Sequence, residues 1–557
     1  MKRFSRGVLV VVLCVAFSAA GGPPLPAQEP PPPAAPEPGT PTLLEYQSAP
    51  GTLSLQEVLK SALEKNLSIA VRRFDPKIAE TNIETEKAFF SPLLDLSARK
   101  SENNQPGSSA LSGGNLVTDR NRSFAATYNE AFEIGSRFQF NVFTNRTSTN
   151  NTFSTVNPSY FSQALATYTQ SFLRNFGLAV NRTGIVIAQN NEKISRSQFR
   201  QTVIETLAAA EKAYWALQFA IMDQKAKEAS LKLAQDFLEQ TRIKVKVGTL
   251  PPIEITQAEA QVADQEEGII TGLAAIRLAE DNLRRLMNIA TDSPLWHQPI
   301  QPTDEPQVLD KIVNEDEAMK TALEKRPDLE QARLDLANRD ASVRFQKNQK
   351  LYRLDLVAQY GAQGLAGTFL PVQVTFVTGD PGTPPGCVPI PSDPTLCTAT
   401  VDPPDLSRWN SYSQIKDRDF NTWSAELQLG IPLGNRAANA AYAQSKYLQD
   451  QSKLTIEQLE QSALVEVRNA VRQIETDLKR VKAAQVNTRL QLEKLSAEQK
   501  KYENGMSTAF QVLTFQTDLT SARRRENLAI VDYNTALVEL DRVLGILLDT
   551  RDVTIAN

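Results

Sequence analysis

The sequence predicts a mainly helical protein that also supplies strands to a β-barrel, and three observations support this fold class. The first is an internal duplication, in which SALEKN at 61–66 matches TALEKR at 321–326 and LLDLSA at 93–98 matches RLDLVA at 353–358 with the same spacing. The second is a pair of very long helical stretches, and the third is a set of strands with alternating apolar and polar residues. Because a repeat fixes the architecture, each half should contain a helix, strands and a helical hairpin in that order.

The N-terminus has the features of a secretory signal peptide. A basic start precedes an apolar run and then small residues, which is the typical order of an export signal: Lys2, Arg3 and Arg6, then 8–17, then Ser18, Ala19 and Ala20. We assign 1–27 to the signal peptide. Cys14 follows Leu13 inside the apolar run, which favours a product without a lipid anchor. The Pro-rich residues 28–52 are expected to form a stiff leader, because proline interrupts helix and sheet hydrogen bonding.

The first repeat, 53–297, is expected to begin with a helix from about 54 to 90. Ser54 and Glu57 have the spacing of a capping box, and Ser91-Pro92 would end the helix. Strands are expected at 93–172, where four strand-like pieces can be distinguished. A helical hairpin should follow at 181–290.

The second repeat, 313–548, follows a linker at 298–312 and repeats the same order. Its strands are expected at 353–431, with a loop insertion at 361–420, its hairpin at 435–548 and a tail at 549–557. The clearest strand is TWSAELQLGI at 422–431, in which apolar and polar residues alternate. A strand of this length fits a soluble sheet and also a membrane barrel, whose strands need ~9 to 11 residues. Export, aromatic-rich strands and polar loops favour the barrel.

The helical stretches are too long for a compact domain. Residues 181–247 and 435–504 contain no proline, and each would span roughly 100 Å. The shorter helices, at about 54–90, 252–290, 315–350 and 509–548, would span roughly 55 to 60 Å each. Each long helix is therefore expected to pack against two shorter ones placed end to end. In the last helix, nine residues recur at spacings of three and four, and all except Glu526 are apolar, which predicts a coiled-coil seam: Leu519, Ala522, Glu526, Ala529, Tyr533, Ala536, Leu540, Val543 and Leu547. The pattern does not decide between an ordinary coil and a tube of helices.

Composition argues against several classes of function. The net charge of −4 gives no reason to expect nucleic-acid binding. The chain has no Walker loop, GxSxG, HExxH or CxxC motif, so neither an enzyme nor a cofactor is expected. The sole histidine, His297, is expected in a loop, and no metal site is predicted. Cys387 and Cys397, in an exported chain, are expected to form a disulfide that staples a surface loop.

The order of these features resembles the TolC-like outer-membrane efflux protein family. The resemblance covers about 53–548 and is carried by LSLQEVLKSALEKNLSIAVRR at 53–73, TQSFLRNFGLAVNRTGIVIAQN at 169–190, LGIPLGNRAANAAYAQSK at 429–446 and two glycine turns. It implies a homotrimer in contact with outer-membrane lipid, with a shared twelve-stranded barrel and a periplasmic helical tunnel. It also implies a belt formed by 311–325 with the chain ends. The implied function is a passive exit duct for small molecules or proteins in a tripartite efflux or type I secretion system, with an inner-membrane pump and a periplasmic adaptor as partners.

The two glycine turns are expected at the periplasmic tip of the tunnel. Gly248 and Gly505 would each end a long helix at positive φ, which glycine adopts without a steric penalty. Thr249, Leu250, Met506 and Ser507 would then be exposed, where a partner's helical hairpin could dock. A purely structural turn is the alternative.

The resemblance also places a constriction beside these turns. Acidic residues are implied just after the second turn, but the matching Gln511 and Thr514 are neutral. After the first turn, the acidic residue that the resemblance implies is present as Glu254, and Gln257 lies one helical turn further on. Tyr502 lies three residues before Gly505. We expect closure through a contact between Glu254 and Tyr502, without a strong cation-attracting ring. The alternative is that these are ordinary polar residues on a solvated helix face.

Two other functions remain as alternatives. A periplasmic coiled-coil adaptor or scaffold would show one helical hairpin flanked by glycine-rich β domains, whereas this chain has two hairpins and alternating strands. A hydrolase with a helical insertion would need a nucleophile motif. Neither the cargo nor the class of pump is specified by the sequence.

Overall fold

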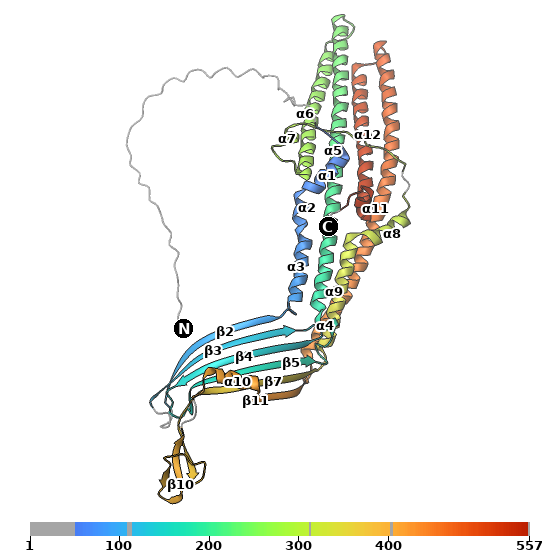
Figure 1. Ribbon diagram of the computed structural model, residues 1–557. Helices are drawn as coiled ribbons and strands as arrows, with labels where there is room; N and C mark the ends of the chain where they lie inside the picture. The colour runs from blue at the N-terminus through green and yellow to red at the C-terminus, as the bar shows by residue number, and fades with distance from the viewer. Residues whose placement is uncertain (1–50, 108–113, 311–312, 402–404, 555–557) are drawn as a thin grey trace, which may run out of the picture. The chain divides into compact units, whose positions relative to one another are not determined.

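The computed structural model describes residues 51–107, 114–310, 313–401 and 405–554 (Figure 1). The predicted signal peptide, 1–27, and residues 28–50 of the predicted leader lie outside the described residues. The described chain begins with the short strand β1 (Gly51–Leu53), which pairs in parallel with β6 (Ile300–Pro302).

Two helical hairpins contain the longest helices. In the first, α5 (Thr183–Lys246) packs against α6 (Ile253–Met287), and in the second, α11 (Arg436–Glu503) packs against α12 (Ala509–Leu544) (Figure 1). At 1.5 Å per residue, α5 and α11 each span roughly 100 Å. The two hairpins contact each other because α12 also packs against α5.

The predicted apolar seam of the last helix is buried. Glu526 is half-buried, and the other eight seam residues are each at most 7% exposed: Leu519, Ala522, Ala529, Tyr533, Ala536, Leu540, Val543 and Leu547. The alanines allow the backbones of neighbouring helices to approach closely. Burial of one stripe on each helix, more than intrinsic propensity, stabilises helices of this kind.

Two of the four shorter helices are interrupted, so the predicted unbroken helices at 54–90 and 315–350 are wrong. The first is divided into α1 (Leu55–Lys65), α2 (Leu67–Arg72) and α3 (Phe74–Ala88), and the second into α8 (Glu315–Lys325) and α9 (Pro327–Gln349). The breaks at Asn66 and Arg326 occupy equivalent positions in the two repeats. Asn66 caps α2 through its side chain, and Arg326 precedes a proline, which disfavours the helical conformation of the residue before it.

The capping box at the first helix is present. The Ser54 amide donates to Glu57 Oε2 (2.8 Å), and the Glu57 amide donates to Ser54 Oγ (3.3 Å). Further along the chain, α3 packs against α5, and α9 packs against both α5 and α11. His297, which was expected in a loop, ends the one-turn helix α7 (Pro294–His297), because Pro294 is favourable at the first position of a helix.

One antiparallel sheet combines strands from both repeats. Its order is β11-β7-β5-β4-β3-β2, and every neighbouring pair is antiparallel. The bounds are β2 (Leu93–Pro106), β3 (Leu116–Ala131), β4 (Ser136–Thr149), β5 (Val156–Ser171), β7 (Arg353–Phe369) and β11 (Phe420–Gly430). Among the described residues the sheet has six strands, whereas a twelve-stranded trimeric barrel would need four from each chain. The described sheet thus has two strands more than that number, because the first repeat supplies an additional hairpin.

The two faces of this sheet differ in polarity. One row of directly opposed residues crosses all six strands and is apolar: Leu94, Tyr128, Phe140, Ala166, Tyr360 and Trp423. The row beside it on the opposite face is polar except at Leu93: Leu93, Asn129, Gln139, Thr167, Gln359 and Ser424. Because successive side chains of a strand point to opposite faces, all six strands contribute to one apolar face.

The insertion between the last two strands is shorter than predicted. The prediction that 361–420 is a loop insertion is wrong for 361–369, which continue β7. This part of β7 is rich in glycine and alanine because α10 (Arg408–Asp417) lies against it: a Cβ on Gly364 would be 2.1 Å from the Ser411 carbonyl oxygen. The rest of the insertion forms a small sheet of β8 (Val372–Val377), β10 (Asp393–Val401) and β9 (Val388–Ile390), with β10 in the centre.

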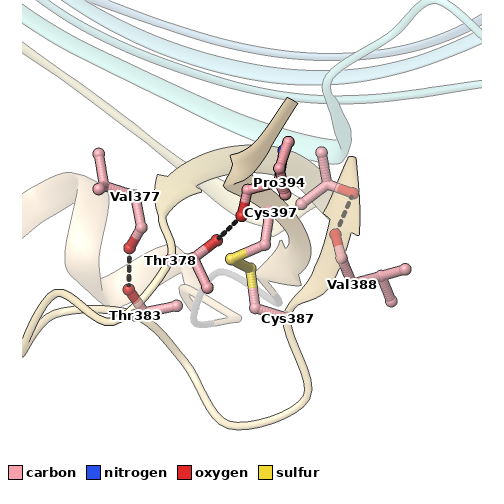
Figure 2. The surroundings of a disulfide bond; sticks show 8 residues. Val377, Thr378, Thr383, Cys387, Val388, Pro394 and Cys397 are labelled. Carbon is pink, nitrogen blue, oxygen red and sulfur yellow. Dashed lines mark hydrogen bonds between the residues drawn. A yellow bond between two sulfur atoms is a disulfide. The ribbon is translucent and has the colours of Figure 1, made fainter. Parts of the chain in front are cut away.

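Cys387 and Cys397, which were predicted to pair, form a disulfide in this small sheet (Figure 2). Cys397 is 1% exposed on β10. Two side-chain hydrogen bonds lie beside the disulfide: Thr383 Oγ1 donates to the Val377 carbonyl (2.8 Å) and Thr378 Oγ1 to the Pro394 carbonyl (3.2 Å) (Figure 2). The disulfide therefore joins the central strand to the loop that precedes β9.

The linker between the repeats is fastened to the helices by two buried tyrosines. Tyr214 on α5 donates to Asp304 Oδ2 (2.8 Å), and burial raises the pKa of Tyr214 to about 12. Tyr533 on α12 donates to the Leu309 carbonyl. These contacts join residues of the predicted linker, 298–312, to both hairpins.

Candidate functional site

The two hairpin tips end their long helices with the same hydrogen-bond motif. In the first, Thr249 N donates to the Lys244 carbonyl (2.9 Å) and Gly248 N to the Val245 carbonyl (3.0 Å). In the second, Met506 N donates to the Lys501 carbonyl (2.9 Å) and Gly505 N to the Tyr502 carbonyl (3.1 Å). Both turns are Schellman motifs, in which the residue after the helix adopts a left-handed conformation. Gly248 has φ 79° and Gly505 has φ 72°.

Replacing Gly505 with alanine should lower the free energy of unfolding by about 1 to 2 kcal/mol, because a Cβ strains the left-handed conformation. Nothing lies within 4 Å of a Cβ at this position, so the effect would be conformational and not a clash. Gly268 is the matched control: it lies inside α6 with equally open surroundings, and alanine there should stabilise the helix by about 0.5 to 1 kcal/mol. Urea titrations followed by circular dichroism would measure both variants, and a loss of stability in both would contradict the explanation.

Two of the four predicted tip residues are exposed, and the other two are half-buried and make contacts within the chain. Thr249 and Met506 are exposed beside the two glycines, and Met506 is 70% exposed. Leu250 is half-buried and packs against the apolar cluster below the tips. Ser507 donates to Glu498 Oε1 (2.6 Å), and this hydrogen bond, together with one from Lys501, lowers the pKa of the Glu498 carboxyl. The expectation that Leu250 and Ser507 lie free at the surface is therefore wrong.

Tyr502 joins the ends of the two hairpins within one chain. Its side chain is 4% exposed, and its ring centroid lies 5.2 Å from that of Phe237 on α5. Lys244 Nζ lies 4.0 Å from the centre of the Tyr502 ring and donates to the Tyr502 carbonyl (3.3 Å). A cation over an aromatic face is an attractive arrangement that strengthens when both groups are shielded from water. Aromatic packing and the cation–π contact thus connect α11 to α5 at the tips.

Glu254, in the first turn of α6, lies close enough to Tyr502 to affect its titration. Burial raises the pKa of Tyr502, and the charge of Glu254 adds to this, whereas the Thr241 hydroxyl opposes it. Within the described chain, Tyr502 Oη and Glu254 Oε2 are buried without an ordinary hydrogen bond. A buried polar atom without a partner costs free energy, so both groups would gain from a new partner.

The other predicted constriction residues are exposed and neutral. Gln257 lies on α6, and Gln511 and Thr514 lie on α12. Thr514 Oγ1 donates to the Phe510 carbonyl of its own helix (2.8 Å). The backbone N–H of Gln511 donates to the side chain of Thr508, the N-cap residue of α12. Among the described residues, none of these three side chains forms a hydrogen bond with Glu254 or Tyr502.

Lys244, Phe237 and Glu498 are the neighbours of the tip residues that sequence reasoning missed. Lys244 and Lys501 occupy equivalent positions in the two repeats, and a cation in the last turn of a helix is favoured by the helix dipole. That regularity could have drawn attention to both lysines. The contact of Lys244 with Tyr502 could not have been found, because it joins residues from different repeats.

The described residues contain neither a candidate metal site nor a candidate membrane-spanning helix. No group of three or more His, Cys, Asp or Glu side chains there could hold a metal ion. No helix among these residues has the length and apolar character needed to cross a membrane.

Comparison with known families decides what the paired hairpins and the sheet represent. A family model described as outer membrane efflux protein matches residues 58–288 and 399–546. The chain belongs to the outer membrane efflux protein family. The predicted TolC-like resemblance is thereby confirmed, and the chain is an efflux protein of the outer membrane with a large periplasmic portion. Proteins of this family transport their cargo and are not enzymes.

Solved structures of other outer-membrane proteins share the fold at low sequence identity. The Campylobacter jejuni channel CmeC is 14% identical, with a TM-score of 0.60 over 88% of this chain and 86% of CmeC. VceC of Vibrio cholerae is 15% identical, with a TM-score of 0.59 over 88% and 96%. MtrE of Neisseria gonorrhoeae, in its open state, is 17% identical, with a TM-score of 0.58 over 90% and 91%. No curated protein matches the chain.

Proposed function

We propose that this efflux protein is the outer-membrane exit duct of a tripartite system and conducts small molecules passively. The observation that carries the proposal is the sheet whose six strands share one apolar face, in the same chain as two hairpins with helices of roughly 100 Å. The apolar face would meet lipid, the polar face would line the pore, and the helices would extend the duct through the periplasm. Energy would come from an inner-membrane pump, because the chain has no nucleotide-binding motif.

Three copies would complete the duct by joining the free edge of β2 to the free edge of β11. Six is an even number, so these two edge strands run in opposite directions and would pair antiparallel, as all other neighbours in the sheet do. Three sheets of six strands make a barrel of eighteen. A barrel of 16 to 18 strands encloses an aqueous channel, so this duct would be wider in the membrane than the twelve-stranded form.

The tips would provide the docking surface for a periplasmic adaptor. Thr249 and Met506 are the exposed side chains beside the two glycine turns. Methionine is flexible and polarizable and therefore adapts to the surface of a helical partner. Leu250 and Ser507 would support this surface from below through the contacts that they make within the chain.

Closure of the tip would depend on Tyr502 and Glu254. In the closed state Tyr502 would hold the two hairpins of one chain together, and its hydroxyl would hydrogen-bond to the Glu254 carboxylate, which the absence of an ordinary hydrogen bond to either atom within the described chain supports. Gln257, Gln511 and Thr514 add no charge, so the closed tip would rely on packing and hydrogen bonds.

Single-channel recording in planar bilayers tests both the duct and its closure. Wild-type protein should give discrete passive currents, whereas an adaptor or scaffold would give none. Glu254→Gln combined with Tyr502→Phe should increase the open fraction, because the contact that holds the tip closed is lost. Glu259→Gln is the control, since Glu259 lies on the same helix in an exposed ion pair with Arg242, and it should behave as wild type. An unchanged open fraction in the double variant would refute the closure mechanism and leave the duct itself standing.

A further inference from the structure

A row of three cations lies on the apolar face of the sheet, at the end of the strands nearer the small disulfide sheet. Lys100 on β2 is directly opposite Arg122 on β3, and Arg122 is directly opposite Arg146 on β4. With neighbouring strands about 4.8 Å apart, the three cations are spread over about 10 Å. The count of positions along β3, from Tyr128 through Ala126 and Phe124 to Arg122, places this row on the same face as the apolar row.

These cations are not neutralised within the described part of the chain. None of Lys100, Arg122 and Arg146 forms an ion pair there, although like charges directly opposite each other destabilise a sheet. The next cation along the same face, Arg120, behaves differently, because it is bound to Glu102 through Nε (3.1 Å). The row therefore retains a local excess of positive charge that an external anion would relieve.

Aromatic and basic groups from α10 extend the row. Tyr160 on β5 is directly opposite Arg146, and the guanidinium groups of Arg146 and Arg408 lie 5.9 Å and 5.7 Å from the centre of its ring. Ser411 of α10 hydrogen-bonds to Ser162 on β5 (2.9 Å), which places α10 on this same face. Trp409, next to Arg408, is 76% exposed. Exposed tryptophan and tyrosine are typical of the level where a membrane meets water.

We propose that Lys100, Arg122, Arg146 and Arg408 form a binding site for the phosphate groups of an anionic lipid in the outer leaflet. The inference rests on the proposed function, because it requires the apolar face to meet lipid. Arginine binds phosphate with two parallel hydrogen bonds, which suits it to a headgroup better than a point charge does. The apolar row lies further along the same strands, so the acyl chains of the same lipid would contact Phe124, Phe140 and their neighbours. A free phosphate ion would lack that second contact.

Native mass spectrometry of the detergent-purified full-length protein, titrated with phosphatidic acid, tests the site. Wild type should bind phosphatidic acid in preference to phosphatidylcholine, and Arg122→Gln with Arg146→Gln should weaken this binding by at least about tenfold. The matched control is Arg99→Gln with Arg137→Gln, which removes the same number of positive charges from β2 and β4 on the opposite face of the sheet and should bind as wild type. Arg122→Lys with Arg146→Lys keeps the charge, and it should bind with intermediate affinity even if the glutamine variant does not fold.

Several results would overturn the inference. Equal loss in the glutamine variant and its opposite-face control would show that only total charge matters. Displacement of the lipid by millimolar inorganic phosphate would show a general anion site without lipid specificity. If the wild-type protein conducts in bilayers but does not bind phosphatidic acid, the lipid site is refuted and the duct stands. If it binds phosphatidic acid but does not conduct, the proposed duct is refuted and the lipid site would need another explanation.

Discussion

Replacing Arg551 with alanine should lower the free energy of unfolding by about 3 to 5 kcal/mol, because it leaves the buried Glu211 carboxylate without the cation that it contacts. Arg551 follows the short helix α13 (Leu547–Thr550) and donates two hydrogen bonds to Glu211 on α5, through Nε (3.1 Å) and Nη2 (2.8 Å). The Glu211 side chain is only 3% exposed. Asp541 on α12 lies 3.6 Å from Nη1 of the same guanidinium. One arginine therefore connects the end of the chain to both hairpins.

The electrostatic balance at Arg551 supports a large effect. Burial alone would lower the pKa of the guanidinium, but the hydrogen bonds and charge of Glu211 outweigh it and raise the pKa. The guanidinium is therefore positively charged in the folded protein. Without Arg551, the Glu211 carboxylate would be buried without the two hydrogen bonds that Arg551 donates to it.

Urea titration of the detergent-solubilised protein, followed by circular dichroism, would measure the loss. Lys325→Ala is the matched control. Lys325 forms an ion pair with Asp549, which lies in α13 just before Arg551, but both side chains of this pair are at least half exposed. Exposed pairs contribute about 0 to 1 kcal/mol, so this variant should lie within that range of wild type. Similar losses for both variants would contradict a special role for the buried pair.

Features that depend on residues close together in the sequence could be predicted from the sequence alone. The duplication was visible as matched motifs at constant spacing, and the glycine turns followed because a helix that reverses within a few residues needs a left-handed residue. The capping box of Ser54 and Glu57 is likewise a short-range pattern. The break at Asn66 was missed because asparagine is tolerated inside helices, although it is a strong N-cap.

The remaining features depend on contacts between distant residues. The continuation of β7 through its glycine-rich end was not readable, because its small residues are explained only by α10 packing against them. The residues 549–557 looked like a tail, but Arg551 is bound to Glu211 on α5. At the tips, the sequence drew attention to Tyr502, but its contact with Lys244 joins the two repeats and was not visible in either one. Sequence therefore identified which tip positions to inspect but not which groups would meet there.

Cysteine cross-linking across the proposed seam between subunits should convert the protein into covalent trimers. Ser97 on the edge strand β2 and alternate residues of the edge strand β11 lie on the polar face, namely Thr422, Ser424, Glu426 and Gln428. Chains that carry Ser97→Cys and one cysteine from the β11 set should form a ladder on denaturing gels after mild oxidation. One position of the set should react best, because a closed barrel fixes the stagger between the two strands.

The length of that ladder decides the number of strands in the barrel. A ladder that ends at three chains means eighteen strands, whereas one that ends at two chains means twelve and refutes the trimer. Leu96→Cys with Ser424→Cys is the control, because these side chains lie on opposite faces and a disulfide needs Cβ atoms about 4 Å apart. Cross-linking by this control would show that the edges meet only through random collisions. The native pair Cys387–Cys397 is already joined within one chain and should not contribute. A trimeric ladder would also explain why neither edge of this sheet has a strand partner among the described residues of one chain, since each edge strand would find its partner in the next copy.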